Sequence, residues 1–313
     1  MELEFIKCQG SGNDFVLVDA VAQRVENLDL AGLSQRLCDR NGGVGADGLL
    51  LLVRAGRGFG MRMFNPDGSE AEMCGNGIRC VARLARRYTN VDRFMLASGG
   101  RSYPVARETD IDGGIPTYGV RIPVAAWSPD FGFFGQGERF VAQTIPSLDG
   151  ELEFTAFSLG NPHIVARCDK ADLQLLTRLG ERVGELRSEF PNGVNVSLFE
   201  VRGKNEIFVA TFERGAGITL SCGTAMTASS TAAALIGACD FGRPIKVRNR
   251  GGMVRCICNE EPSLATELIG NATFEYAATV RDNGDGGLEV EKTKSFGAEV
   301  ENYKTFAERE RGF

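Results

Sequence analysis

Apolar and polar positions along the first half of the chain follow two periodicities, which indicates strands mixed with helices. Gly48–Val53 is a continuous apolar run of strand length, and Phe59–Phe64 alternates between apolar and polar positions. Val16–Val18 predicts a further short strand. Apolar residues at helical spacing predict helices over Leu30–Arg40, with Asp29 as its N-cap, and over Asn76–Tyr88.

The second half repeats this pattern, with helices predicted over 172–182 and 223–236. Four landmarks recur in the same order at an offset of 148 positions. They are Gly12-Asn13 and Gly160-Asn161, Gly45 before Asp47 and Gly193 before Asn195, Phe64 and Phe212, and Cys74-Gly75 and Cys222-Gly223. We interpret the chain as two copies of one mixed α and β unit, each of which contributes a cysteine.

The repeat predicts two domains and a C-terminal extension. We expect an N-terminal domain over 1–122, with the boundary near Arg121–Trp127, and a C-terminal domain over 123–272. A strand at about 273–281 is expected to return to the first domain. Residues 282–313 are charged, begin with a Gly-rich stretch at 283–287, and contain few aliphatic residues. We expect a solvent-facing segment or a partly disordered tail; the alternative is an interface or lid element with an exposed helix over Tyr303–Arg311.

Composition narrows the class of protein. The 313 residues carry a net charge of −6, which argues against a nucleic-acid-binding face. The acidic N-terminus has no apolar signal segment, and no run is long enough to cross a membrane. Nine cysteines without a secretory signal are typical of reduced thiols in the cytoplasm. We therefore expect a cytoplasmic protein with a small-molecule ligand and no nucleic-acid or membrane partner.

The two repeated cysteines are candidate acid–base groups. Cys74 and Cys222 each precede a glycine and a predicted helix. A helix N-terminus favours the thiolate and also binds anions such as a substrate carboxylate. Two such thiols on opposite faces of one bound anion suit stereoinversion at a carbon acid, in which one removes a proton and the other delivers one. Backbone amides stabilise the carbanion, so no cofactor is required.

Other polar groups carry weaker signals. The remaining seven cysteines are expected to be small buried apolar residues. Cys256 and Cys258 lack the spacing of a zinc site, and no metal is expected. His163, the single histidine, follows the repeated Gly-Asn, so we expect it to have a functional role. Glu213-Arg214 precedes a Gly-rich turn, a pattern that is also common on ordinary surfaces.

Taken together, these motifs resemble the diaminopimelate epimerase family. The resemblance rests on Gly10–Phe15, Phe64–Glu70, Cys74–Cys80, Gly160–His163 and Glu213–Thr224, and it extends from the first residues to about Val280. It implies an isomerase of two pseudosymmetric α+β domains, each with a β-barrel-like sheet around a central helix. It further implies cofactor-independent, two-base interconversion of LL- and meso-diaminopimelate, for lysine and peptidoglycan synthesis, and commonly a homodimer.

The resemblance also assigns residue roles. Cys74 and Cys222 match the two acid–base thiols, and His163 and Glu213 match polar partners that tune them. Substrate-binding positions of the family are matched by Asn13, Asn65, Gly75, Asn76, Asn161, Asn195, Glu213, Arg214, Gly223 and Thr224. An arginine that binds the distal carboxylate in bidentate fashion suits a dicarboxylic substrate.

The chain departs from the family pattern in a few places, and other functions stay open. Thr224 stands where serine is common, and Asp47-Gly48 stands where some members carry glutamine. One alternative is a racemase of another amino acid on the same fold, which would not need Arg214 as a distal anion site. A thiol redox switch is an alternative from another class, in which Cys74 and Cys222 form a reversible disulfide. A non-catalytic amino-acid-binding module is a third.

Overall fold

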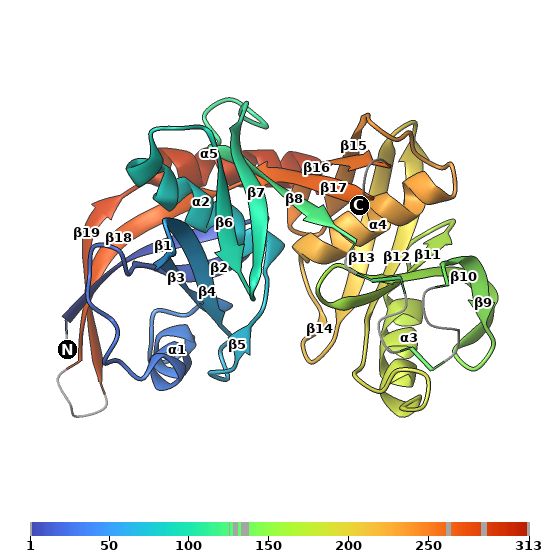
Figure 1. The fold of residues 1–313 in the computed structure, drawn as a ribbon, viewed down its shortest axis with the longest axis horizontal. Coiled ribbons are helices and arrows are strands. Elements are labelled where there is room, and N and C mark those ends of the chain that lie inside the picture. Colours follow the sequence, from blue (N-terminus) through green and yellow to red (C-terminus); the bar gives the residue numbers. More distant parts are fainter. Residues whose placement is uncertain are drawn as a thin grey trace. The chain divides into compact units, whose positions relative to one another are not determined.

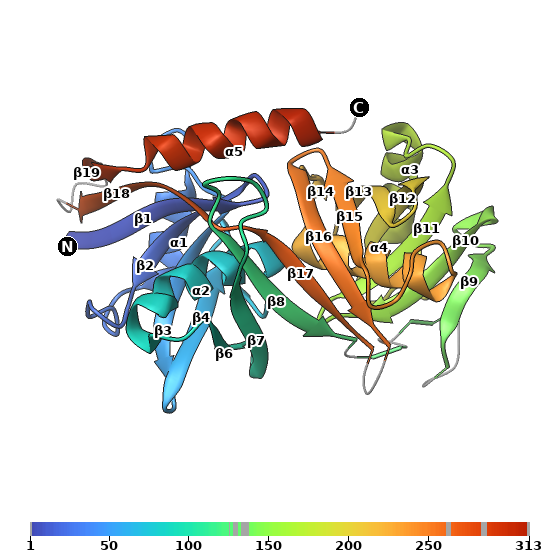
Figure 2. The ribbon, with the colours of Figure 1, turned by 90° about the horizontal axis from the view of Figure 1, so that it is seen from above.

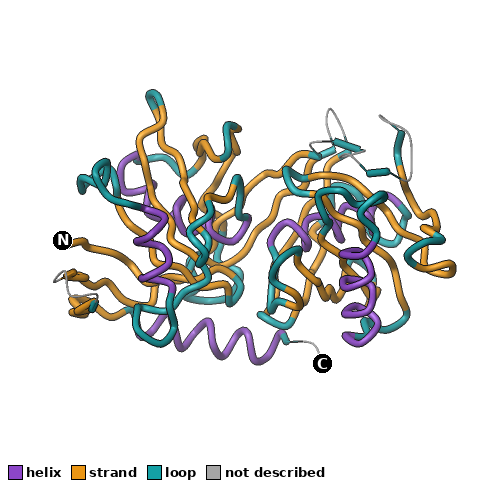
Figure 3. The backbone as a smooth tube through the Cα atoms, turned by 90° about the horizontal axis from the view of Figure 1, so that it is seen from below, coloured by secondary structure: helices purple, strands orange, loops and turns teal. Residues whose placement is uncertain are grey.

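The structure is a computed structural model, and it describes residues 2–124, 126–127, 131–132, 138–260, 264–282 and 287–311 (Figure 1). The chain forms two compact units. Unit 1 contains residues 1–120 and 269–308, and unit 2 contains residues 121–268 and 309–313. Strands are more abundant than helices (Figure 3), and the mixture is the α+β class that the hydrophobic pattern predicts.

Unit 1 is a mixed sheet in which two pairs of neighbouring strands are parallel and the others are antiparallel. Its strands are β1 (Glu2–Gly10), β2 (Asn13–Asp19), β3 (Gly48–Ala55), β4 (Gly58–Phe64), β5 (Glu70–Ala71), β6 (Arg93–Ser98), β7 (Arg101–Glu108), β8 (Thr117–Pro123) and β18 (Thr273–Asp282). The β2–β3 and β4–β6 pairs are parallel, whereas β1–β2, β3–β4, β4–β5, β6–β7 and β7–β8 are antiparallel. The returning strand β18 pairs with β1, as the sequence predicts.

Helices make both parallel crossovers in unit 1, because parallel neighbours cannot be joined by a tight turn. The first is α1 (Leu30–Cys38), which begins at Asp29, whose side chain accepts a hydrogen bond from the amide of Gly32. The second is α2 (Gly75–Thr89), which packs against β1, β2, β3, β4, β6 and β7. All residues from Gly75 to Cys80 are buried, so the first turns of α2 lie inside the unit.

Unit 2 has the same pairing order, one element after another. Its strands are β9 (Phe140–Ile145), β10 (Asp149–Ser158), β11 (Pro162–Cys168), β12 (Asn195–Gly203), β13 (Glu206–Glu213), β14 (Gly217–Ile218), β15 (Pro244–Asn249), β16 (Gly252–Asn259) and β17 (Ala265–Asn271). The β11–β12 and β13–β15 pairs are parallel, and β9–β10, β10–β11, β12–β13, β13–β14 and β15–β16 are antiparallel. The chain passes from one unit to the other within β8, within β17 and near the end of the C-terminal helix, between residues 308 and 309.

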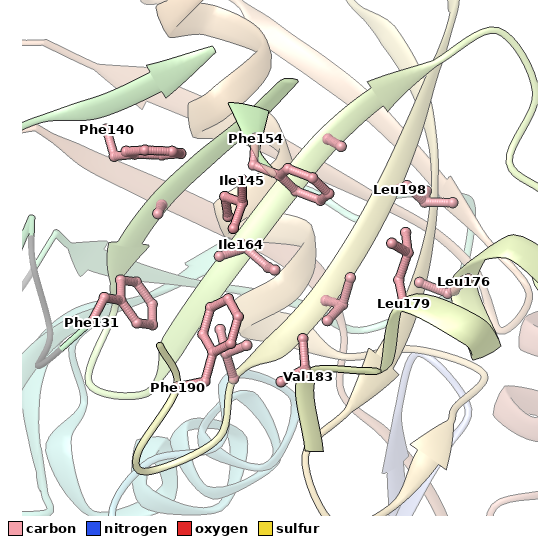
Figure 4. Close-up of a cluster of buried hydrophobic side chains, with 14 of the residues drawn as sticks. Phe131, Phe140, Ile145, Phe154, Ile164, Leu176, Leu179, Val183, Phe190 and Leu198 are labelled. Carbon is pink, nitrogen blue, oxygen red and sulfur yellow. The ribbon is translucent and has the colours of Figure 1, made fainter. Parts of the chain in front are cut away.

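The helices of unit 2 are α3 (Leu173–Glu185) and α4 (Gly223–Leu235). Every residue of α4 from Gly223 to Ala234 is buried, and the helix is rich in Ala, Ser and Thr, which allows close packing against β11, β12, β13, β15 and β16. One face of α3 closes an apolar core over the sheet (Figure 4). The core includes Phe140, Ile145, Phe154, Ile164, Leu176, Leu179, Val183, Phe190 and Leu198.

The C-terminal extension differs from the expectation. It forms β19 (Leu288–Ser295), which pairs with β18, and α5 (Gly297–Glu310) (Figure 2). The helix that the interface or lid alternative expects to be exposed is partly buried, because Tyr303 and Phe306 are buried. The helix begins six residues earlier than predicted, and near its start Glu299 receives two hydrogen bonds from Arg83 of α2, at 2.6 and 2.8 Å. The Gly-rich start at 283–286 lies outside the described residues, as does position 125 in the expected boundary segment.

Within the described part of the chain, every helix is too short or too polar to cross a membrane.

Candidate functional site

In unit 1, Cys74 occupies the N-cap position of α2. Its backbone is extended, with φ −135° and ψ 114°, and its sulfur accepts a hydrogen bond from the amide of Gly77 at 3.3 Å. The side chain is partly exposed, whereas Gly75, Asn76 and Gly77 behind it are buried. A helix N-terminus carries unpaired amides and a partial positive charge, so this position favours the thiolate and an anionic ligand.

Two asparagines surround the Cys74 thiol. Asn13, at the start of β2, presents Oδ1 to the Cys74 sulfur at 3.9 Å and to Asn76 Nδ2 at 3.4 Å. The other end of the Asn13 amide, Nδ2, donates to Asp47 Oδ2 at 2.6 Å. The structure therefore brings Asn13, Cys74, Gly75 and Asn76 together at the start of α2, and their binding of one substrate stays a prediction.

Arg79 is a buried arginine whose place at the site the sequence pattern does not predict. Its side chain is fully buried under the first turn of α2, where it donates to the carbonyl of Gly75 at 2.9 Å and to Asn76 Oδ1 at 3.1 Å. It also donates to Ser11 Oγ and to the carbonyl of Asn271. In the sequence, Arg79 stands one helical turn beyond Gly75, on an otherwise apolar helix face. This pattern alone does not predict which groups accept its hydrogen bonds.

Asn65 lies on the turn that follows β4. Its amide donates to Ser69 Oγ at 2.9 Å, and its backbone closes the same turn through Ser69 and Gly68. Those hydrogen bonds hold Asn65 within its own turn, with the side chain partly exposed. The geometry leaves its assignment to substrate binding as a prediction.

In unit 2, Cys222 takes the same position at the start of α4. Its backbone is extended, with φ −116° and ψ 117°, and its carbonyl accepts the first helical hydrogen bond from Met226. Burial raises the pKa of the Cys222 thiol well above its usual value, and the nearby Glu213 carboxylate adds to the rise. The Thr224 hydroxyl, 3.5 Å from the sulfur, and the amide of Ala225 act in the opposite direction. Because burial dominates, Cys222 is held as a thiol at neutral pH.

His163 is fully buried on β11, next to Asn161. Its Nε2 lies 3.0 Å from Asn161 Oδ1, and Asn161 Nδ2 donates to Thr224 Oγ1 at 3.1 Å. Burial, with a smaller contribution from the Arg214 guanidinium, lowers the pKa of His163 to about 3. His163 is therefore a neutral imidazole across the physiological pH range, and it donates through Nε2–H to the amide oxygen of Asn161.

Asn195 and Arg214 form a second cluster in unit 2. Asn195 is nearly fully buried, and its Oδ1 accepts from the Arg214 amide at 3.0 Å. The Arg214 side chain is exposed and lies over Gly193, where an added Cβ would be 2.8 Å from Arg214 Cδ. Glu213, the preceding residue, accepts from Thr219 Oγ1 at 2.6 Å. Arg214 Nη1 donates to the Asn192 carbonyl at 2.5 Å, which holds the exposed guanidinium beside an ordered turn, where its other N–H groups can meet a ligand carboxylate.

Among the described residues, no three His, Cys, Asp or Glu side chains are grouped so that they could hold a metal ion.

A family model described as diaminopimelate epimerase matches residues 5–102 and 155–275, which is most of the chain. The chain belongs to the diaminopimelate epimerase family. It is 35% identical to the diaminopimelate epimerase of Clostridium acetobutylicum over 98% of this chain and 95% of the relative. It is 38% identical to the diaminopimelate epimerase of Lactiplantibacillus plantarum over 90% of each chain. Members of this epimerase family are isomerases that act on a small-molecule substrate.

Solved structures of low sequence identity share the fold of this epimerase family member. A PhzF-family phenazine biosynthesis protein of Bacillus anthracis matches with a TM-score of 0.65 and 16% identity, over 90% of this chain and all of that one. A hydroxyproline epimerase from Agrobacterium vitis matches with a TM-score of 0.61 and 15% identity, over 91% of this chain and 95% of that one. These likenesses confirm the α+β fold class and say nothing further about the substrate.

Proposed function

We propose that the chain interconverts LL- and meso-diaminopimelate by cofactor-independent proton transfer at the α-carbon, with Cys74 and Cys222 as the two acid–base groups. The observation that carries this proposal is that each cysteine is the N-cap of a helix with a buried first turn, one in each unit. Each helix start provides amides for the substrate carboxylate beside a thiol. Family membership supplies the substrate class.

The environments of the two thiols support a division of roles in one direction of the reaction. Cys222 is a thiol at neutral pH because of burial and Glu213, and it serves as the proton donor. Cys74 receives the Gly77 amide at the start of α2, which supports a thiolate that removes the α-proton. In the reverse direction the roles exchange, because the product leaves each sulfur in the other protonation state.

The amides at the two helix starts stabilise the charge that develops during proton removal. The α-proton of an amino acid is very weakly acidic, so the carbanion needs donors aimed at its carboxylate. We assign this role to the backbone amides of Gly75, Asn76, Gly223 and Thr224. Amides in the first turn of an α-helix have no carbonyl partner within the helix, so they can donate to a substrate carboxylate.

The distal end of the substrate requires recognition of a second amino group and a second carboxylate. We assign the carboxylate to Arg214, whose guanidinium is exposed beside the ordered Asn195. The asparagines Asn13, Asn65 and Asn161 supply carbonyl and amide groups suited to an ammonium and a carboxylate. His163 acts on the surroundings of Cys222 indirectly, through its hydrogen bond with Asn161. Glu213 acts directly, because its carboxylate raises the pKa of the Cys222 thiol. The proposal includes a cytoplasmic location, lysine and peptidoglycan precursor synthesis, and a homodimer.

The function is tested by proton NMR of LL-diaminopimelate with the reduced protein in deuterium oxide. We expect the α-proton signal to disappear as the meso isomer forms. Cys74→Ser and Cys222→Ser should each lower turnover by about a thousandfold or more, because a serine hydroxyl is far too weak an acid to replace the thiol. Cys168→Ser is the matched control, since Cys168 is also partly exposed but bonds the Phe199 carbonyl on the sheet.

Each alternative outcome leads to a different conclusion. Exchange with another amino acid but not with diaminopimelate would contradict the substrate assignment. No exchange with any amino acid, although the thiols are verified to be free, would favour the redox-switch alternative. Near-native turnover of either serine variant at Cys74 or Cys222 would contradict the two-base mechanism.

A further inference from the structure

We propose that Asp47 is a positioning residue for Cys74: its carboxylate fixes the orientation of the Asn13 amide, so that the carbonyl oxygen and not the NH₂ group faces the thiol. The inference rests on the proposed function, because it takes Cys74 to be an acid–base group. All residues involved lie in unit 1.

The orientation follows from hydrogen-bonding capacity at one end of the amide. An ionised carboxylate only accepts hydrogen bonds. The Asn13 side-chain atom that lies 2.6 Å from Asp47 Oδ2 must therefore be the nitrogen. Asp47 is itself held in place: its Oδ1 accepts from Arg40 Nη2 at 2.7 Å, and its Oδ2 accepts from the amide of Asp14 at 3.1 Å.

The other end of the amide is constrained independently. A guanidinium only donates hydrogen bonds, so the Asn76 atom that lies 3.1 Å from Arg79 Nη1 must be its oxygen. The Asn76 nitrogen then points away from Arg79 and meets Asn13 Oδ1 at 3.4 Å. A donor-only group, Arg79, and an acceptor-only group, Asp47, thus fix two amides in a row, and the resulting Asn13 oxygen lies 3.9 Å from the Cys74 sulfur.

The second unit lacks this device. The position that corresponds to Asp47 in the repeat is Asn195, whose amide bonds the Pro162 carbonyl and the Arg214 backbone. Asn161, which corresponds to Asn13, gives its oxygen to His163 and its nitrogen to Thr224, which lies beside Cys222. Among the described residues, the Asn161 oxygen thus faces His163, whereas the Asn13 oxygen faces the Cys74 sulfur.

The chemical effect is on the basicity of Cys74. The start of α2 and the Gly77 amide stabilise the thiolate, and a thiolate that is stabilised too far is a weak base. A carbonyl oxygen beside the sulfur favours the protonated form and offsets this stabilisation. If the NH₂ group faced the sulfur, it would add a further donor to the thiolate. Asp47 therefore keeps Cys74 basic enough to remove a weakly acidic α-proton.

The test is the pH dependence of iodoacetamide alkylation of Cys74, followed by mass spectrometry of the peptide that carries it. In Asp47→Asn the partner can donate as well as accept, so the Asn13 amide is free to turn. We expect the alkylation midpoint to move to lower pH by about half a unit to one unit, the effect of one hydrogen bond on the thiolate. Epimerisation should fall about tenfold, as for other groups that orient a reacting side chain.

Two further variants separate orientation from charge. Asp47→Glu keeps an acceptor-only carboxylate and should restore a midpoint close to that of the wild type. Asp14→Asn removes a negative charge from the same cluster of Lys7, Asp14, Arg40 and Asp47, but Asp14 does not bond the Asn13 amide through its side chain. It should move the midpoint by less than Asp47→Asn does.

The results overturn the inference if Asp47→Asn leaves the midpoint unchanged, or if Asp14→Asn moves it equally far. Alkylation uses no substrate, so this test stands even if the amino acid proves not to be diaminopimelate. Conversely, if the wild-type protein does not exchange the α-proton of diaminopimelate, the proposed function is contradicted, but the alkylation result can still be interpreted.

Discussion

Acidification of the protein from pH 7 to pH 5 tests the neutral state of His163 directly. His163 is fully buried, its Nε2 is committed to Asn161, and none of the described residues gives its Nδ1 a hydrogen-bond partner. Its pKa is about 3 in the native state, against an ordinary value of 6.5. The unfolded chain therefore takes up the proton first as the pH falls. The stabilisation is fully present above pH 6.5 and is lost progressively from there down to about pH 3.

The magnitude follows from this difference in proton affinity. Between pH 7 and pH 5 the unfolded imidazole becomes protonated while the native one does not, which lowers the free energy of unfolding by about 2 kcal/mol. Carboxylates of ordinary pKa contribute little in this window, because those values lie near 4. Burial raises the pKa of Glu275, but its contribution is the same in the wild type and in His163→Gln and cancels when the two are compared. The sequence contains one histidine, so no other imidazole contributes.

The assay compares urea unfolding of the wild type and His163→Gln at the two pH values. Glutamine can donate to Asn161 but does not titrate, so the variant should lack the 2 kcal/mol of pH dependence, whatever its absolute stability. NMR gives a second readout, because the single Hε1 resonance should not shift between pH 8 and pH 5. A native-state titration of the ring with a midpoint near pH 6.5, or an equal pH dependence in both proteins, would refute the reasoning.

Two packing predictions use matched variants within one helix. In α3, an added Cβ at Gly180 would lie 2.2 Å from the Phe212 ring, so Gly180→Ala should lower the free energy of unfolding by about 2 kcal/mol or more. Gly184 has open space around it, so Gly184→Ala should raise the free energy of unfolding by about 0.5–1 kcal/mol. Chemical unfolding measures both. Equal effects of the two alanines would contradict the close approach of α3 to β13. In α5, Phe306→Ala should lower the free energy of unfolding by about 3 kcal/mol, because the ring is buried. Val300 is exposed, so Val300→Ala should change the free energy of unfolding by less than about 0.5 kcal/mol. A neutral Phe306→Ala would show that α5 is not docked in solution.

Local signals in the sequence determined most of the secondary structure and the candidate acid–base groups. Asp29 caps α1 as predicted, because N-capping needs only a side-chain oxygen and the next few amides. The helices after Cys74 and Cys222 begin at the glycines that mark them. The repeat located both cysteines at the same position relative to their helices, since a repeated segment reproduces its own local interactions.

Only the tertiary structure decided how buried groups are paired and protonated. Glu299 and Arg83 lie far apart in the sequence, so no local pattern could show that the charged C-terminal segment docks as a helix. The low pKa of His163 depends on its burial beneath other elements. The orientation of the Asn13 amide depends on Asp47, and α1 with its flanking loops lies between these two residues in the sequence. Capping and periodicity act over a few residues and can be predicted from the sequence, whereas burial and the choice of hydrogen-bond partner belong to the packed fold.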